Sequence, residues 1–479
     1  MSLLSTLGSS SSVLTVFERA MDVTQNNVAN ASTPDFASQN LDLASMPFDP
    51  AHGLKGGVEA GQLESTRSEF ADAAVRLQEQ SLGAAQQKVS SLTTIQTALN
   101  LSGSDGIPAS LSALFQAFSA WSAAPSDSAS RRAVLNSAQQ LADSFHSVMA
   151  SVNQAAGDTA TQIAQTVDQI NTLGANLHTY NLERMSGDVH DPGLDAKIHA
   201  TLDSLSTLVN FTSKIEPDGS VTVLLGGQTP LVIGDHAYQI SSQVAPPANL
   251  PPGTPPTPPT AVILDSAGRA ITGQMTGGAL GALVDTHNRV LAGLRGDSTQ
   301  PGVLNQMAQA LADRVNQLLA AGNISDGPPP APGVALFSYD TTNATNVASS
   351  LGVAAGMTPD QLAAIDPGPP EVGNGTALKL ANLQDSENPA DQITGLNYSQ
   401  FYGNLAAAVG RELSTAHDQH DVQQQLVAQA RAFQQQTSGV SLDAEAVKML
   451  QFQRAYEANA KFITVLDALT ETAVNIIPA

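Results

Sequence analysis

The sequence predicts a mainly α-helical protein. Its N- and C-terminal helices pair as a coiled coil, a bundle of long helices lies between them, and a small β-rich portion is inserted. Heptad patterns of apolar residues at both ends of the chain are the first observation behind this prediction. The second is composition, because only 4% of the 479 residues are aromatic and a core of Ala, Leu and Val favours close helix packing. The third is that β-branched runs are confined to one stretch, residues 210–264.

The last stretch, residues 441–477, carries an unbroken heptad stripe, in which positions recur at alternating steps of three and four. The stripe comprises Met449, Phe452, Tyr456, Asn459, Ile463, Leu466, Thr470, Ala473 and Ile477, with Ala455, Phe462, Leu469 and Ile476 beside it. A helix about 55 Å long, at about 1.5 Å per residue, cannot bury such a stripe against itself. The stretch therefore needs a partner helix.

The first 31 residues supply a partner helix in the same register. Its stripe comprises Leu3, Leu7, Ser10, Leu14, Phe17, Met21, Thr24 and Val28, with Val13 and Ala20 alongside. Gly8 and the serines that follow weaken this helix, because both residue types are unfavourable in an isolated helix. We expect an antiparallel pair that brings the chain ends together. The alternative is two independent amphipathic helices packed on the central domain.

Charge and composition argue against several classes of partner. Acidic residues outnumber basic ones 43 to 20, giving a net charge of −23, so we expect no binding to nucleic acid or to anionic membranes. The absence of cysteine removes disulfides, thiolate catalysis and Cys-ligated zinc, and it suits a protein that stays unfolded during export. No apolar run approaches the ~18 residues of a membrane span. Because the first residues lack a basic segment and a continuous apolar core, we expect no cleaved signal peptide.

The first half of the middle region is predicted to be helical after a short extended segment. Pro34 disfavours helix at Thr33 and ends the first helix. Residues 37–64 are expected to form an extended loop or a short hairpin. We expect helices over residues 65–101 and 111–121 and, from a cap at Ser126 or Asp127, up to about Leu182.

The second half holds the strands and the closing helices. Pro217-Asp218-Gly219 indicates a hairpin turn between two β-branched runs. We expect strands over residues 210–215, 221–225, 231–233, 238–240 and 262–264. Residues 248–260 are predicted to be a Pro-rich surface connection rather than a ligand for a recognition domain. We expect helices over residues 281–294, 303–322, 396–436 and from Ser441 onward, with Gly- and Pro-rich loops at 322–375.

We therefore predict three units. Residues 1–64 and 441–479 form the terminal coiled-coil domain, residues 65–210 and 276–440 form the helical bundle domain, and residues 211–275 form the small β-rich portion with its Pro-rich loop. Because the halves of the first two units lie far apart in the sequence, the middle of the chain loops out from the terminal pair.

Two segments next to the terminal helices carry distinctive polar patterns. One follows the N-terminal helix and includes Asn27, Ala29, Asn30, Thr33 and Phe36. The other opens the C-terminal helix and includes Gly439, Leu442, Asp443, Glu445, Gln453 and Tyr456. Together they resemble the terminal motifs of the bacterial flagellar axial proteins, the family of rod, hook and hook-associated subunits. Asp35 stands where this family usually has Gly, and Asp tolerates the positive φ that the resemblance implies for this turn.

The middle of the chain narrows the resemblance to the hook-associated proteins of the hook–filament junction. Residues 113–145 are similar to one of their blocks. The pair at 281–294 and 303–322 looks like a helix pair that rod and hook proteins lack. Many members carry a β domain inserted near Leu336-Phe337, and the short distance to the closing helices predicts its absence here. Residues 194–198 lack an Arg–Asp pair that is usual in the family, so the ion pair it supplies must be missing or replaced.

The resemblance implies a structural subunit that forms the junction between hook and filament and is needed for flagellum assembly. The implied partners are the hook protein, the next hook-associated junction protein, further copies of this chain in a ring or helical array, and a cytosolic export chaperone at the C-terminal helix. The implied location is the flagellum, reached by the flagellar type III export route. The expected assembly interface comprises Leu3, Leu7, Leu14, Phe17, Met21, Val28, Met449, Phe452, Tyr456, Ile463, Leu466 and Ile477.

Residues that could carry chemistry form only weak patterns. His417 and His420 have a spacing able to hold a divalent metal, but no glutamate base or third ligand accompanies them. A second group fits no calcium or zinc template; it comprises Asp188, His190, Asp191, Asp195 and His199. Residues 277–281 lack the lysine of a phosphate-binding loop. We therefore predict no metal, no cofactor and no enzymatic activity.

Three alternatives remain open at this point. A flagellar rod or hook subunit should lack the helix pair at 281–294 and 303–322. A muramidase-like enzyme fused to an axial segment would need a pair of catalytic carboxylates in a domain of its own, and the chain has no residues left over for one. A secreted adhesin with coiled-coil ends is the third.

Overall fold

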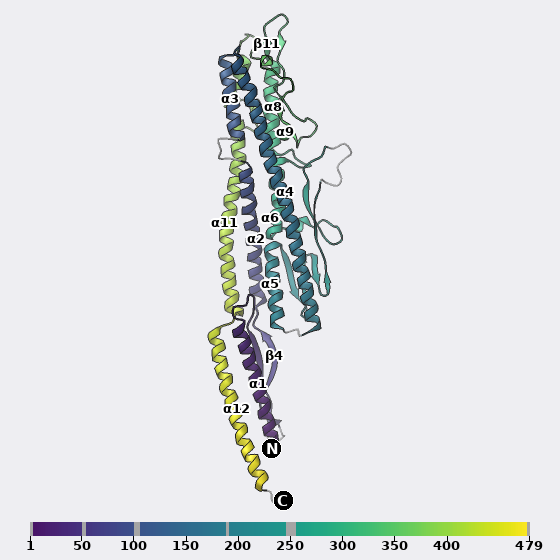
Figure 1. The fold of residues 1–479 in the computed structure, drawn as a ribbon, viewed down its shortest axis with the longest axis vertical. Helices are drawn as coiled ribbons and strands as arrows, with labels where there is room; N and C mark the ends of the chain where they lie inside the picture. Colours follow the sequence, from purple (N-terminus) through teal and green to yellow (C-terminus); the bar gives the residue numbers. More distant parts are fainter. Residues whose placement is uncertain (1–2, 50–53, 100–105, 188–190, 246–254, 477–479) are drawn as a thin grey trace.

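The computed structural model is an elongated molecule, with a pair of helices at one end and a bundle of long helices at the other (Figure 1). The structure describes residues 3–49, 54–99, 106–187, 191–245 and 255–476. Helices dominate this part of the chain, so the predicted mainly α-helical class is confirmed.

The terminal pair consists of α1 (Leu3–Ala29) and α12 (Leu442–Ile476), which run in opposite directions (Figure 1). Near the bundle, Asn27 of α1 contacts Glu445 of α12. Farther out, the rings of Phe17 and Phe452 lie 6.4 Å apart. The predicted antiparallel pairing of the terminal helices is therefore confirmed.

Helix α1 continues through the Gly8 segment that we expected to weaken it. Serine side chains there bond to the backbone of the preceding turn, with Ser9 Oγ donating to Thr6 O at 2.9 Å and Ser12 Oγ donating to Gly8 O at 3.0 Å. These bonds satisfy the hydroxyl groups without breaking the helix.

A β-hairpin lies against α1, where the sequence predicted an extended loop or a short hairpin. Its stem pairs β1 (Gln39–Ser45) with β4 (Val58–Ser65), and its tip pairs β2 (Phe48–Asp49) with β3 (Leu54–Lys55). The contacts of α1 with β1, β3 and β4 make the hairpin a second partner of this helix.

The larger hydrophobic core lies between α2 (Glu69–Ala98), α3 (Ile107–Ala123), α4 (Ser128–Ser186), α8 (Val303–Ala321), α10 (Gly375–Asn382) and α11 (Tyr398–Ser438). Helix α5 (Pro192–Leu208) packs in a second core, with α4 and the β-rich portion. Asp127 caps α4 by accepting a bond from Ser130 N at 2.9 Å, as the sequence predicted. The larger core contains the single tryptophan, Trp121, fully buried.

The helix expected over residues 281–294 is not a regular α-helix. The chain forms α6 (Gly278–Asp285), then a π-helical stretch, η3 (Thr286–Leu291), then α7 (Ala292–Arg295). In the π-helical stretch, the amide side chain of Asn288 bonds to both the N–H and the C=O of Ala261. These two bonds tie the helix to a neighbouring strand, a tertiary contact that hydrophobic periodicity does not reveal.

The β-rich portion packs on α4, α5 and α6. A sheet of order β5-β6-β7-β8 and a separate hairpin of β9 and β10 form it. The strands are β5 (Phe211–Ile215), β6 (Val221–Leu225), β7 (Thr229–Ile233), β8 (His236–Ala237), β9 (Ser241–Ala245) and β10 (Thr260–Leu264). The strand expected at 238–240 is wrong, because Ile240 N–H bonds to the Asn171 side chain instead of to a strand.

The loops expected at residues 322–375 contain short elements. Paired strands are β11 (Asn323–Ser325) with β12 (Ala331–Pro332) and β13 (Phe337–Ser338) with β14 (Gly352–Val353), and single turns of helix are α9 (Val347–Ser350) and η4 (Pro359–Gln361). Two further single turns, η2 (Thr272–Gln274) and η5 (Pro389–Asp391), lie outside this stretch. Leu336 and Phe337, near which the resemblance implied the insertion point of a further domain, lie buried in the larger core. In the described part of the chain, no helix is long and apolar enough to cross a membrane. The three-unit division stays a prediction.

Candidate assembly interface

The predicted heptad stripes lie along the contact between α1 and α12. On α12 the stripe residue Leu466 is only 6% exposed. The half-buried stripe residues are Leu7, Leu14, Phe17, Met21, Met449, Phe452, Tyr456 and Ile463. Val28 is 43% exposed, and the side chain of Leu3 and residue Ile477 lie outside what the structure describes. The part of these residues in assembly stays a prediction.

The most buried positions of α1 are not confined to the predicted stripe. Thr24 belongs to the stripe and Ala20 lies alongside it, whereas Val16 and Asn27 lie outside it. All four are nearly inaccessible, because α1 packs against the hairpin as well as against α12. Periodicity predicted the first partner but not the second. The buried face of α1 is therefore wider than the face that a two-helix contact needs.

Further large apolar side chains of α12 are exposed outside the predicted stripe, in two groups with the charged residues Arg454, Glu457 and Lys461 between them. Val447, Leu450, Phe462, Val465 and Leu469 are each between 48% and 56% exposed. We call these five residues the outer stripe; Phe462 and Leu469 belong to the third column of the sequence pattern. Large exposed apolar patches on soluble proteins mark interaction sites, since covering them stabilises the complex by roughly 25 cal/mol per Å².

The terminal pair meets the bundle at a joint centred on Asn27, which is fully buried. Its Oδ1 accepts a bond from Gln39 N at 2.9 Å, and its Nδ2 donates to Gln39 O at 2.8 Å. The same Nδ2 lies within bonding distance of Ser38 Oγ and of Glu445 Oε2, at 3.3 and 3.2 Å. One side chain thus connects α1, the start of the hairpin and α12.

Glu445 brings the C-terminal motif into the same joint. It is 2% exposed, and Lys448 Nζ donates to its second oxygen at 2.9 Å. The carboxylate therefore has an amide on one side and an ammonium group on the other, which compensates its burial. Sequence reasoning named Asn27 and Glu445 as motif residues; the structure places them in contact.

The loop between α1 and the hairpin has the conformation that the resemblance implied. Asp35 has φ of 55°, so Asp adopts the left-handed region that is usually occupied by Gly. Asn30 Oδ1 accepts a bond from Thr33 Oγ1 at 3.1 Å, and Arg67 Nη2 donates to the carbonyl of Asp35. The contact between Thr33 and Asn30 holds the turn from within the loop, and the contact with Arg67 holds it from the start of the bundle.

The last residue of α11 closes the joint. Ser438 O accepts a bond from Ser38 N at 2.9 Å, and Ser438 Oγ accepts one from Ser68 N at 3.0 Å. The next residue is Gly439, where a Cβ atom would lie 2.4 Å from Gln435 O. Only glycine fits that close approach, so the break between α11 and α12 depends on it.

The remaining motif residues do not enter the joint's hydrogen-bond network. Phe36 and Tyr456 are half-buried, and the exposed motif residues are Ala29, Leu442, Asp443 and Gln453. Their exposure leaves them free to contact other molecules, which the single chain does not show.

Next to the joint lies a cluster of ionic side chains, buried or half-buried except for the exposed Arg431, which we call the charged cluster. It comprises Arg67, Asp72, Arg76, Glu79, Arg184, Asp195, His199, Asp203 and Arg431. Arg67 donates to Asp195 at 2.7 Å and to Asp72 at 3.0 Å. Asp195 also accepts a bond from Arg184 at 2.9 Å. Two arginines from outside α5, Arg67 and Arg184, therefore pair with Asp195. They take the place of the Arg–Asp pair that the resemblance led us to expect near residues 194–198.

Of the described residues, Glu69, Asp72 and His199 are the ones whose potential ligand atoms come together as for a metal ion. The arrangement fits a metal poorly, because Arg76 Nη2 lies 2.6 Å from His199 Nδ1 and Arg67 bonds to Asp72. Guanidinium groups already neutralise these carboxylates, so a cation would be repelled. Residues 188–190 of the loop group fall outside the described residues.

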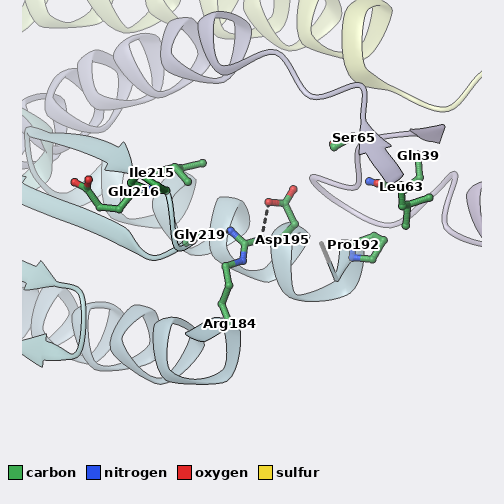
Figure 2. A pocket seen from close by; sticks show the side chains of 10 residues that line it. Gln39, Leu63, Ser65, Arg184, Pro192, Asp195, Ile215, Glu216 and Gly219 are labelled. Carbon is green, nitrogen blue, oxygen red and sulfur yellow. Dashed lines mark hydrogen bonds and ion pairs between the residues drawn. The ribbon is translucent and has the colours of Figure 1, made fainter. Parts of the chain in front are cut away.

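Figure 2 shows a cleft of about 250 Å³ beside the joint, between the hairpin, the end of α4 and the start of α5. Asp195 and Glu216 line it, with Arg184 bonded to Asp195. Burial works to raise the pKa of Asp195, but His199, Arg67 and Arg184 outweigh it and lower that pKa. A general acid needs a raised pKa, so Asp195 does not suit that role.

Comparison with known protein families shows to which family the chain belongs. The profile of the "Flagellar hook-associated protein FlgK helical domain" matches residues 92–337, about half of the chain. The chain belongs to the FlgK family of flagellar hook-associated proteins. The profile of the "Flagellar basal body rod FlgEFG protein C-terminal" matches residues 434–476, which are the end of α11, the joint and α12.

Individual relatives of this FlgK-family chain agree with the assignment. Flagellar hook-associated protein 1 of Bacillus subtilis is 24% identical and aligns over 96% of each chain. The protein of the same name from Salmonella typhimurium is 32% identical over 23% of this chain and 19% of its own length. The solved flagellar hook junction protein FlgK from Burkholderia pseudomallei has the same fold, with a TM-score of 0.59, 17% identity, and coverage of 74% of this chain and all of that one. The predicted family is therefore confirmed.

Sequence reasoning described two parts of this FlgK-family site incompletely. The sequence predicts an extended loop or a short hairpin at residues 37–64, but not its packing against α1, because the strands lack clean alternation of buried and exposed residues. The charged cluster was missed because its members are far apart in the sequence. The one sequence signal for the charged cluster was the pair of basic residues Arg67 and Arg76, near the start of a helix that contains several acidic residues.

A double substitution tests whether two histidines of α11 have a chemical role. His417 is exposed, and His420 is half-buried, with its Nδ1 3.1 Å from Asp421 Oδ1. We expect His417→Gln with His420→Gln to change the free energy of unfolding by no more than about 0.5 kcal/mol, as for other surface sites. Thermal unfolding with and without added zinc checks this. A zinc-dependent rise in Tm of the wild type that the double variant loses would show a metal site.

Asp203 makes the stability of the charged cluster depend on pH. Burial raises the pKa of Asp203 to about 7, with Arg76 opposing and Asp35 and Glu79 adding to the rise. Because an unfolded Asp titrates near ~3.9, the folded state holds this proton more tightly, and the free energy of unfolding falls as pH rises from about 4 to about 7. We expect thermal unfolding to show that Asp203→Asn raises Tm more, or lowers it less, at pH 8 than at pH 5. An equal change at both pH values would contradict this.

Proposed function

We propose that this chain is a structural subunit of the bacterial flagellum that forms the junction between hook and filament. The observation that carries the proposal is the outer stripe on α12, an apolar face that the single chain leaves uncovered next to a firmly bonded joint. Such a face needs neighbouring molecules, and a ring of copies supplies them. The name of the Bacillus subtilis relative, which aligns over nearly the full length of both chains, supports the same role.

In this proposal the terminal pair lies in the inner tube of the flagellar axis and the bundle forms the next shell. The outer stripe packs against the terminal helices of adjacent copies, and the interface includes the residues predicted from the heptad stripes. The hook protein contacts one side of the ring and the next hook-associated protein contacts the other. Before assembly, an export chaperone covers the C-terminal helix, and the chain leaves the cell by the flagellar type III route.

The proposed role is structural and not catalytic. The charged cluster supports this, because Arg67 and Arg184 pair with Asp195, the cluster carboxylate that lines the cleft beside the joint, and the pKa of Asp195 is lowered. A rod or hook subunit is less well supported, since α6 to α8 occupy the region that the FlgK helical domain profile matches.

A labelling experiment tests the location. Because the sequence contains no cysteine, Gln228→Cys in the exposed turn between β6 and β7 provides a single attachment site for a gold label. We expect electron microscopy of intact flagella to show gold in one band at the hook–filament boundary. Gold along the hook, along the rod, or only in the culture medium would contradict the proposal.

A further inference from the structure

The half of α11 next to the joint carries an uncovered apolar face. Val422, Leu426 and Phe433 are 54%, 36% and 46% exposed, and we call them the α11 stripe. Their spacing of four and seven residues places them on one side of the helix. Residues 422–440 contain one charged side chain, Arg431, which is bonded to Glu79 of the same molecule. Because the net charge is −23, this neutral face is one that a second copy can approach with little repulsion.

An apolar groove lies on the surface between α4 and α5. It has a volume of about 460 Å³, and its apolar residues are Leu173 of α4 and Leu208 of α5, both half-buried. The other residues that line it are polar; they are Asp168, Gln169, Thr172, Ser204 and Thr207. Covering the two leucines with apolar side chains would remove apolar area from water, so the groove suits the residues of the α11 stripe.

The stripe and the groove lie at the same height along the bundle. Thr207 packs against α2 at Gly83, where a Cβ atom would lie 2.1 Å from Thr207 O. Helices α2 and α11 are antiparallel, and Glu79 bonds to Arg431 between them. Gly83 lies four residues beyond Glu79 on α2. Leu426 lies five residues before Arg431 on α11, so it is level with Gly83 and Thr207 to within about one turn.

The two surfaces belong to different sides of the molecule. Helix α11 packs on α2, α2 packs on α5, and α5 packs on α4, so α2 separates α11 from the groove (Figure 1). A contact between the stripe of one copy and the groove of the next is therefore heterologous. Contacts of this kind repeat from copy to copy in a ring or a helical array.

Opposite charges accompany the two surfaces at matching heights. Helices α4 and α11 both run toward the joint (Figure 1). Arg411 is exposed three turns before Val422 on the same side of α11, and it forms no ion pair with another described residue. Asp158 is exposed on α4. Arg411 lies 15 residues before Leu426, and Asp158 lies 15 residues before Leu173, so both are roughly 22 Å farther from the joint than the apolar residues.

We propose that the α11 stripe of one copy docks into the groove between α4 and α5 of the next copy. Leu426 then lies beside Leu173, and the guanidinium group of Arg411 faces the carboxylate of Asp158. The inference rests on the proposed function, because it assigns the contact between the bundles of neighbouring copies in the array. This contact adds to the one that the outer stripe makes between terminal helices.

Cross-linking in intact flagella tests the contact, because the chain has no cysteine of its own. A short bis-maleimide should join Leu426→Cys with Thr207→Cys into a ladder of dimers, trimers and higher multimers. The matched control is Leu426→Cys with Thr161→Cys, since exposed Thr161 lies 12 residues before Leu173, roughly 18 Å farther from the joint. The control pair should stay monomeric, as should Leu426→Cys alone. Equal ladders from both pairs, dimers from Leu426→Cys alone, or only monomers from the first pair would overturn the proposal.

A charge exchange tests the register without cysteines. Arg411→Glu should lower the amount of the chain in purified flagella about two- to fivefold, as expected for an exposed ion pair. Arg411→Glu with Asp158→Arg should restore it. Equal amounts of the single and double variants would overturn the proposal. Absence of the wild-type chain from flagella would overturn the proposed function and this inference together, whereas flagella that contain the chain without cross-links would overturn this inference alone.

Discussion

Replacing Leu466 by Asp should abolish assembly while leaving the bundle folded. Leu466 is the most buried stripe residue of α12, and loss of its packing alone costs about 2–5 kcal/mol. The new carboxylate would also be buried without a partner, which adds to the cost. Because the bundle has its own hydrophobic core, its helices should keep their thermal unfolding transition. We expect the variant to be secreted but not incorporated into flagella.

The control for this experiment lies two residues away. Thr464 is exposed on the same turn of α12, so Thr464→Asp adds the same charge without entering the contact with α1. It should assemble as the wild type does. Normal incorporation of Leu466→Asp, detected in purified flagella, would show that the contact between the terminal helices is not needed for assembly.

Replacing Asn27 by Leu should open the joint between α1, the start of the hairpin and α12. The substitution leaves the backbone N–H and C=O of Gln39 without their partner, and each unpaired buried group costs about 1–3 kcal/mol. Glu445 also loses a donor. We expect the joint to open locally rather than the bundle to unfold, since the core lies elsewhere. Amide hydrogen exchange should therefore accelerate at the start of the hairpin and in the first turn of α12, with little change in α4.

Gln25→Leu is the matched control, because Gln25 is exposed on the same helix. Its exchange pattern should equal that of the wild type. If Asn27→Leu and Gln25→Leu gave the same pattern, the hydrogen bonds of Asn27 would not be what holds the joint together.

The sequence was most informative where one periodic pattern had one partner. The antiparallel terminal pair followed from two heptad stripes, and the start of α4 followed from Asp127 as a cap. Burial on α1 was predicted less well, because the hairpin covers a second face of that helix. The terminal pairing could be predicted from the two chain ends alone, and the cap of α4 from the residues next to it.

The polar parts of the site could be predicted only as motifs. The resemblance identified Asn27 and Glu445, but their contact joins residues 418 positions apart, which local patterns do not encode. The charged cluster is similar, since Arg67 and Asp195 meet across 128 positions. The π-helical stretch at Thr286–Leu291 escaped prediction because Asn288 bonds to a strand that is formed earlier in the chain.

Cysteine reactivity measures directly whether the outer stripe of α12 becomes buried between subunits. Val465→Cys places the single thiol of the chain on the outer stripe, where the native side chain is 56% exposed. Gln228→Cys, on the β-rich portion, is the control. In the free subunit both thiols should react rapidly with a maleimide. In intact flagella we expect the thiol at 228 still to react and the thiol at 465 not to react. Equal reaction of both thiols in flagella would show that the outer stripe stays exposed between subunits.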